Sequence, residues 1–118
     1  MSRHIEFASD RLIITFTGLT VAAALKKEIT VPLTAVSSVR VGDFKINPIA
    51  FRIGTSGITR NMKHGRFLYQ NEWVFLSFSN HKNVLIIDLD DFEYKKIVLE
   101  LDSPEETKMK IESLLAQV

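Results

Sequence analysis

The sequence contains no cysteine among its 118 residues. This absence excludes disulfide bonds, thiolate metal sites and a thiol nucleophile, and it fits a reducing compartment. Long apolar stretches are also missing, because no run approaches the ~18 residues that span a bilayer, and the first residues hold no apolar signal core. We therefore expect a soluble, cytoplasmic protein that forms one domain over residues 1–118.

An excess of charge of either sign is missing as well. Fifteen basic side chains against fourteen acidic ones give a net charge of +1, whereas nucleic-acid-binding domains are typically strongly basic. Hydrophobic residues make up 46% of the chain, which is more than a disordered segment carries. The composition favours a globular protein and argues against a nucleic-acid partner.

What the sequence does contain is a series of segments with strand character. Residues 11–17 are the clearest, because Leu12, Ile14 and Phe16 point to one face and the residues between them to the other. Seven further strands are predicted at residues 5–7, 27–31, 36–41, 66–69, 73–78, 84–89 and 96–101. Short turns between the last four predict an antiparallel meander. Residues 19–25 favour a short helix or an irregular crossover, since their propensities conflict with those of their neighbours.

One long helix is predicted to begin after Ser103. Ser103 and Glu106 have the spacing of a capping box, and Pro104 suits the first helical position. An apolar stripe then follows the helical period, formed by Pro104, Thr107, Ile111, Leu114, Leu115 and Val118. Met109 falls opposite this stripe. Such a helix packs its apolar side against a sheet.

This order of elements resembles the pleckstrin-homology-like (PH-like) barrel, and in particular the small bacterial PH-like domains. The matching segments are residues 29–33, 36–41, Gly57, 65–67, 84–87 and 98–105. The resemblance implies a mainly β fold, an antiparallel barrel of about seven or eight strands with the C-terminal amphipathic helix closing one end. Lipid-binding members have a basic loop between their first two strands, and this chain has Ala8-Ser9-Asp10 there.

Residues 43–66 form the longest predicted connection and the first candidate for a contact surface. Five cations against one acid, Asp43, are interleaved with apolar side chains, a mixture that suits an acidic partner or an anionic membrane surface. The alternative is that the apolar side chains pack onto the sheet and the cations are solvated. The residues predicted to make contact are Lys45, Phe51, Arg52, Arg60, Lys63 and Arg66.

A second charged stretch is acidic and lies within six residues, formed by Asp88, Asp90, Asp91 and Glu93. It either attracts the basic residues of another subunit or forms a polar turn, and it lacks the pattern of a calcium loop. The histidines His4, His64 and His81 have no spaced partner of the kind that zinc sites use, and we expect them at the surface.

No nucleophile, acid and base can be assembled from the sequence, and Gly54-Thr55-Ser56-Gly57 lacks the lysine of a phosphate-binding loop. We therefore predict a non-catalytic interaction module without cofactor or metal, which acts through protein–protein contacts or self-assembly. The residue 43–66 loop and the free sheet edges are the expected contact elements. The alternative function is peripheral binding of anionic membrane lipid through that loop.

Overall fold

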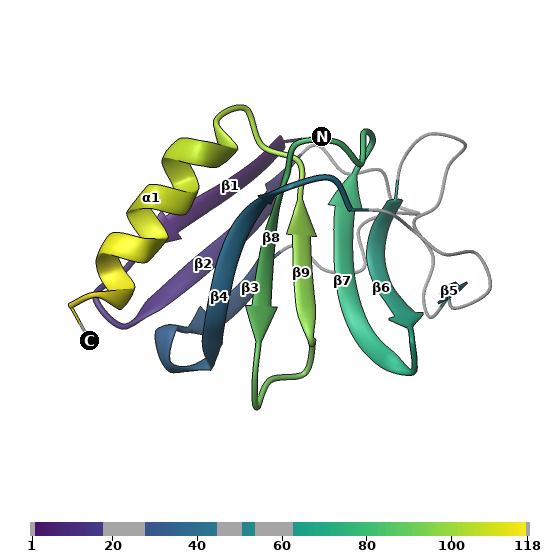
Figure 1. Ribbon diagram of the computed structural model, residues 1–118, viewed down its shortest axis with the longest axis horizontal. Helices are drawn as coiled ribbons and strands as arrows, with labels where there is room; N and C mark the ends of the chain where they lie inside the picture. The colour runs from purple at the N-terminus through teal and green to yellow at the C-terminus, as the bar shows by residue number, and fades with distance from the viewer. Residues whose placement is uncertain (1, 18–27, 45–50, 54–62, 118) are drawn as a thin grey trace.

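The computed structural model describes residues 2–17, 28–44, 51–53 and 63–117, with the backbone alone at residues 2, 51–53 and 63. It is mainly β with one C-terminal helix, as predicted (Figure 1). All eight predicted strands are present, and β5 is an addition. The elements are β1 (Ser2–Phe7), β2 (Arg11–Thr17), β3 (Glu28–Pro32), a 3-10 turn (Leu33–Ala35), β4 (Val36–Gly42), β5 (Phe51–Ile53), β6 (Lys63–Tyr69), β7 (Glu72–Phe78), β8 (Val84–Leu89), β9 (Lys96–Leu99) and α1 (Pro104–Leu115).

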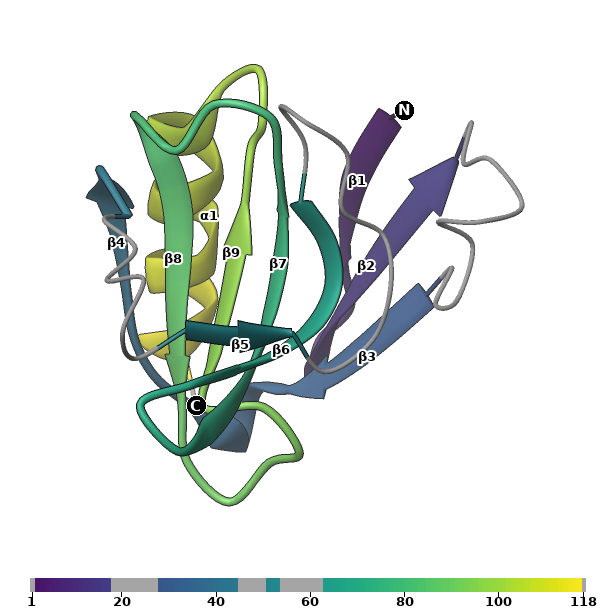
Figure 2. The same cartoon turned by 90° about the vertical axis from the view of Figure 1, so that its right-hand side faces the viewer.

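The strands form two sheets that face each other (Figure 2). The first has the order β1-β2-β3, and both of its strand pairs are antiparallel. The second has the order β4-β8-β9-β7-β6-β5. β1 is an edge strand, because it pairs with β2 on one side and with no described strand on the other.

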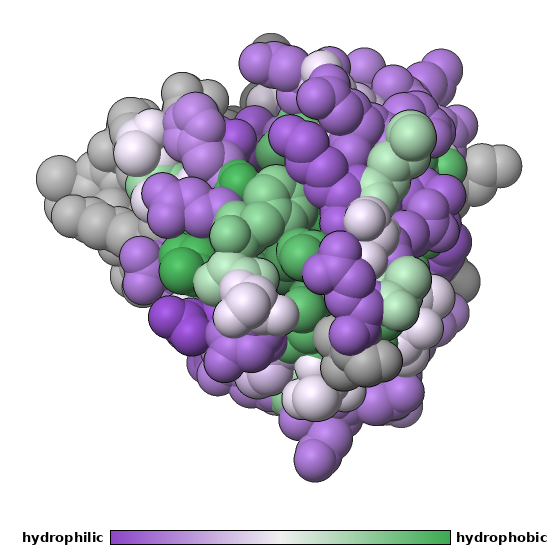
Figure 3. Space-filling view, turned by 90° about the vertical axis from the view of Figure 1, so that its left-hand side faces the viewer, coloured by the Kyte–Doolittle hydropathy of each residue, from purple (hydrophilic) through white to green (hydrophobic). Residues whose placement is uncertain are grey.

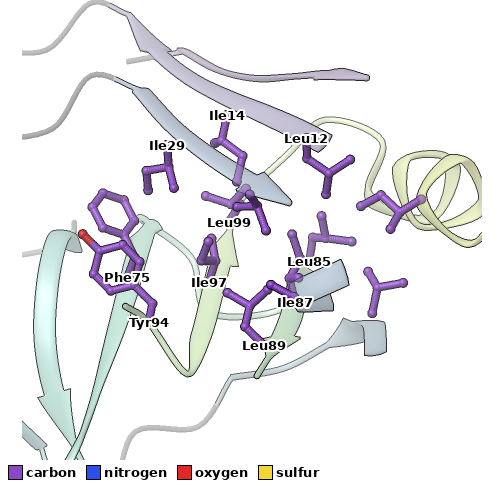
Figure 4. Close-up of a cluster of buried hydrophobic side chains, with 14 of the residues drawn as sticks. Leu12, Ile14, Ile29, Phe75, Leu85, Ile87, Leu89, Tyr94, Ile97 and Leu99 are labelled. Atoms are coloured by element: carbon purple, nitrogen blue, oxygen red, sulfur yellow. The ribbon is translucent and has the colours of Figure 1, made fainter. Parts of the chain in front are cut away.

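The main core fills the space between the sheets. Leu12, Ile14 and Phe16 of β2 are buried there as the alternation predicts. In Figure 4 the side chains of Ile14 and Ile29 lie opposite Leu99 of the second sheet. Burying a large apolar side chain contributes roughly 1.5–3 kcal/mol, so this cluster is the main stabilising element that joins the two layers.

The second sheet also buries its other face. The four consecutive residues 84–87 of β8 are all buried, because Val84 and Ile86 join a second apolar cluster while Leu85 and Ile87 join the main core. A continuous apolar run is what a strand covered on both faces requires. The second cluster consists of Phe44, Phe67, Val74, Leu76, Phe78, Val84, Ile86 and Val98.

The helix α1 packs onto the main core through the predicted stripe. Ile111 is fully buried and Leu114 and Leu115 are partly buried against the core, whereas Met109 is 67% exposed. The predicted capping box is wrong, because the side chain of Ser103 makes no capping hydrogen bond. Its carbonyl oxygen instead accepts from the backbone N–H and the hydroxyl of Thr107, both at 3.1 Å.

The predicted meander of the last four strands is wrong at one position. β9 lies between β7 and β8, antiparallel to β8 and parallel to β7. The turns before and after β8 are short, so the sequence predicted that β8 would pair with both β7 and β9. β9 is apolar on both faces, which allows it to lie in the centre of the sheet, between β8 and β7. No strand pair joins the two sheets among the described residues, so the expected closed, all-antiparallel barrel does not appear there.

The predicted loop at residues 43–65 is also corrected. It contains β5 and the first residues of β6, and these two strands pair antiparallel, with Phe51 opposite Tyr69 and Ile53 opposite Phe67. A three-residue strand is too short to show a period of two, and this one stands among glycines and a proline that favour loops. The predicted helix or crossover at residues 19–25 lies outside the described residues.

Candidate functional site

A groove of about 640 Å³ runs between the free edge of β1 and the N-terminal half of α1. Ile5, Phe7 and Leu101 supply apolar surface in it. Its polar lining residues are Arg3, His4, Ser79, Glu100, Asp102, Ser103, Thr107 and Lys110. Figure 3, viewed from the side that carries α1, shows apolar side chains gathered in a patch bordered by hydrophilic ones. The groove therefore combines three apolar side chains with a larger number of polar and charged ones, a mixture that is found in binding sites for protein chains.

The free edge of β1, which borders this groove, has the properties of an edge that can pair with a further strand. Along β1 the side chains of Arg3 and Ile5 are partly buried, and those of His4 and Glu6 are exposed. Because β2 is the one described strand that pairs with β1, half of the backbone N–H and C=O groups of β1 point away from the described sheet. Phe7 is 37% exposed at the end of this edge. An extended segment could thus gain both backbone hydrogen bonds and an apolar contact here.

Lys110 of α1 borders the same edge. Its ammonium group lies 5.8 Å from the centroid of the Phe7 ring, a distance at which a cation is attracted to an aromatic face. The same lysine lies 3.8 Å from the carboxylate of Glu106. The exposed ring of Phe7 is therefore placed beside a cation and remains accessible from solvent.

Arg3 fastens the edge strand to the second sheet. Its Nε donates a 2.7 Å hydrogen bond to Oγ of Ser77 on β7, and this oxygen lies 2.9 Å from Nδ1 of His64 on β6. Burial lowers the pKa of Arg3, and the carboxylate of Glu100 acts in the opposite direction. These contacts fix the position of β1 relative to β7, so the groove has a defined shape.

His64 is buried, and the prediction that all three histidines lie at the surface is wrong for it. The ring is 1% exposed and stands edge-on to Phe16 and Phe75, at centroid distances of 4.8 Å and 5.4 Å. Ser77, its partner, is 0% exposed, and neither residue lines the groove. The contact between them therefore joins β6 to β7 away from the groove. This contact could not be predicted from local pattern, because His64 and Ser77 come from separate strands.

Glu100 shapes the end of the groove. Its Oε1 accepts hydrogen bonds from the backbone N–H groups of Ser79 and Asn80, at 2.7 Å and 3.2 Å. The backbone N–H of Glu100 in turn donates to the carbonyl oxygen of Ser77 at 3.0 Å. The turn after β7 is thus held against the segment that leads into α1.

The six contact residues predicted from the sequence do not define this groove. Lys45 and Arg60 lie outside the described residues, and Phe51, Arg52 and Lys63 are described by their backbone, in β5 and β6. Arg66 is exposed, with its guanidinium carbon 4.4 Å from the centroid of the Trp73 ring. The groove was missed because β1 and α1, which form it, are far apart in the sequence.

The acidic stretch forms contacts within its own chain. Asp88 accepts hydrogen bonds from Ser38 at 2.8 Å, from Arg40 at 3.2 Å and from Lys96, and Asp90 accepts one from Lys95 at 2.9 Å. Burial raises the pKa of Asp88, but the hydrogen bonds from Lys96, Arg40 and Ser38 outweigh it and lower the pKa to about 2. These intrachain pairs weaken the hypothesis that the stretch attracts another subunit.

The low pKa of Asp88 predicts a loss of stability in acid. Because the pKa of Asp88 is lower in the folded than in the unfolded chain, its carboxylate stabilises the fold at pH values above about 4. This contribution is lost as the pH falls towards 2. Asp88→Asn should therefore lower the unfolding free energy by about 1–2 kcal/mol at pH 7, after allowance for solvent screening. Urea unfolding at pH 7, 4 and 2 should show the difference from the wild type shrinking as the pH falls, to a small remainder at pH 2 where Asp88 is half protonated in the folded protein. Asp90→Asn is the control, because Asp90 forms an exposed ion pair with Lys95. Its unfolding free energy should differ little from that of the wild type, and by a similar amount at each pH.

The described residues contain neither a metal-binding cluster nor a helix that could span a membrane. No three histidine, aspartate or glutamate side chains there are close enough to hold a metal ion. None of the helical segments in that part of the chain has the length and apolar character needed to traverse a bilayer. Comparisons of the chain with protein-family models, with curated proteins and with solved structures give no match.

Proposed function

We propose that this protein is a cytoplasmic, non-catalytic interaction module that binds an extended segment of a protein chain along the free edge of β1. The observation that carries the proposal is the groove of about 640 Å³ beside an edge of β1 that pairs with no described strand, with Ile5 and Phe7 in its lining. An added strand would hydrogen-bond to the β1 backbone, and alternate side chains would enter the groove.

The PH-like resemblance is part of this proposal. The order of the elements and the packing of α1 on the core support it, whereas the parallel pair β7–β9 departs from an all-antiparallel barrel. A fold of this class does not determine its ligand. The proposed function therefore rests on the groove and not on the resemblance.

The test is selection of random twelve-residue peptides against the immobilised protein, followed by binding measurements with the selected peptides. We expect them to alternate apolar and polar residues, and to shift the backbone amide resonances of residues 3–7 and 107–110. Phe7→Asp should weaken binding at least about tenfold, since it places a charge in the apolar contact. Met109→Asp is the matched control, because Met109 is exposed and does not line the groove.

Two outcomes would overturn the proposal. One is that selected peptides shift resonances elsewhere or bind Phe7→Asp as well as the wild type. The other is that the protein binds no peptide but pellets with vesicles of phosphatidylserine and phosphatidylcholine, in a manner that weakens with salt and is lost in Trp73→Asp. That result would favour the lipid-binding alternative, for which the exposed Arg66–Trp73 pair is the supporting observation.

A further inference from the structure

We infer that the segment bound at the edge of β1 is β1 of a second copy of this chain, paired antiparallel about a two-fold axis at Ile5. This inference rests on the proposed function and names its partner. The resulting dimer would join the two three-stranded sheets into one continuous sheet, an isologous contact in which each copy uses the same surface.

Symmetry restricts the possible registers. Antiparallel pairing of two identical edge strands requires a two-fold axis normal to the sheet, which keeps the groove side of both copies on the same side. Two directly opposed residues must then have side chains on the same face of the sheet. Along one strand, side chains lie on the same face when an even number of positions separates them. The axis therefore passes through a residue, and the four inner positions of β1 are Arg3, His4, Ile5 and Glu6. Centring on Arg3 would oppose two guanidinium groups, which leaves His4, Ile5 and Glu6.

The charges on the exposed face select Ile5 among these three. With Ile5 on the axis, His4 of each copy lies opposite Glu6 of the other, which places an acid against a base twice. Centring on His4 would oppose two imidazoles, and centring on Glu6 would oppose two carboxylates, an arrangement that destabilises a sheet. His4 and Glu6 are both exposed in one copy, so both side chains are accessible for this contact.

The groove side is complementary in the same register. Ile5 would meet its symmetry mate, and Arg3 would lie opposite Phe7 of the second copy. Phe7, which is 37% exposed in one copy, would thereby lose apolar surface to solvent, and the stem of Arg3 would cover part of the ring. Cross-strand neighbours have Cβ atoms about 4.5–5.5 Å apart, close enough for these contacts.

The opposite edge of the same sheet does not offer this complementarity. The outer side of β3 borders a hollow lined by three acids, Glu28, Asp91 and Glu93, and β3 ends at Pro32, which has no N–H to donate. Two copies placed edge to edge there would oppose like charges. In the three-stranded sheet the charge pattern thus favours β1 as the self-pairing edge.

The experiment is a measurement of solution mass by sedimentation equilibrium up to about 100 µM, a range that detects micromolar dissociation constants. We expect the wild type to reach twice the 13.4 kDa of one chain. His4→Glu should raise the dimer dissociation constant at least about tenfold, because it opposes carboxylates at both symmetric contacts. The double variant His4→Glu, Glu6→Lys should restore the dimer by exchanging the charges. Circular dichroism on each variant establishes that it is folded.

The outcomes separate this inference from the function on which it rests. A wild type that stays monomeric at about 100 µM, or a dimer that His4→Glu leaves unchanged, would overturn self-pairing at β1. Peptide binding that Phe7→Asp abolishes would still uphold β1 as a contact edge for another protein. Weakening by His4→Glu without recovery in the double variant would also contradict the register centred on Ile5.

Discussion

Replacing Ile111 with aspartate is expected to unfold the protein. Ile111 is 0% exposed and lies where α1 meets the main core, so the new carboxylate would be buried without a partner. We expect a cost of about 4 kcal/mol or more, against the total of about 5–15 kcal/mol that stabilises a typical domain. The measurement is urea unfolding followed by tryptophan fluorescence and circular dichroism.

The matched control is the same substitution at Met109, two residues earlier on the same helix. Met109 is 67% exposed, so Met109→Asp should change the unfolding free energy by no more than about 0.5 kcal/mol. Similar losses from both variants would mean that α1 does not present the Ile111 side to the core. Leu114, which is partly buried on the same side, should give an intermediate loss when replaced with aspartate.

Phe75→Ala has the second largest expected effect. Phe75 is 1% exposed, and its ring centroid lies within 5.5 Å of the rings of Phe16, His64 and Tyr94. Truncation removes these contacts and leaves a cavity between the sheets, at a cost of about 3–5 kcal/mol. Thermal and urea unfolding should both show the loss.

Trp73→Ala on the same strand is the control for Phe75→Ala. Trp73 is 37% exposed, and its ring centroid lies 4.4 Å from the guanidinium carbon of Arg66, so the expected loss is about 1 kcal/mol. If Trp73→Ala costs as much as Phe75→Ala, the main core is not where the structure places it. The two variants thus compare truncation of a buried aromatic residue with truncation of a larger but partly exposed one on the same strand.

Local pattern predicted the elements of this fold well. The bounds of β2 and β8 were predicted without error, because apolar residues alternate in β2 and run continuously in β8 between turn residues. The start of α1 at Pro104 was also predicted. Each of these signals lies within the element itself, so no knowledge of distant contacts was needed.

Features that depend on distant segments could not be predicted in the same way. The central place of β9 follows from pairing with β7 and β8 at once, and the burial of His64 depends on Ser77 and on aromatic rings from other strands. The groove likewise needs β1 and α1 together. Charge and composition alone directed attention to residues 43–66, where only Arg66 among the six predicted contacts has a described side chain.

The central place of β9 limits when the chain can acquire its structure. Lys96–Leu99 connect the part of the sheet formed by β5, β6 and β7 to the part formed by β4 and β8. Segments emerge from the ribosome in sequence order, so a nascent chain that ends before residue 99 holds two sheet fragments with no strand between them. Long-range pairing of this kind is slow. The second sheet can therefore be completed only after β9 has left the exit tunnel, and until then the apolar strands on either side of it lack their partner.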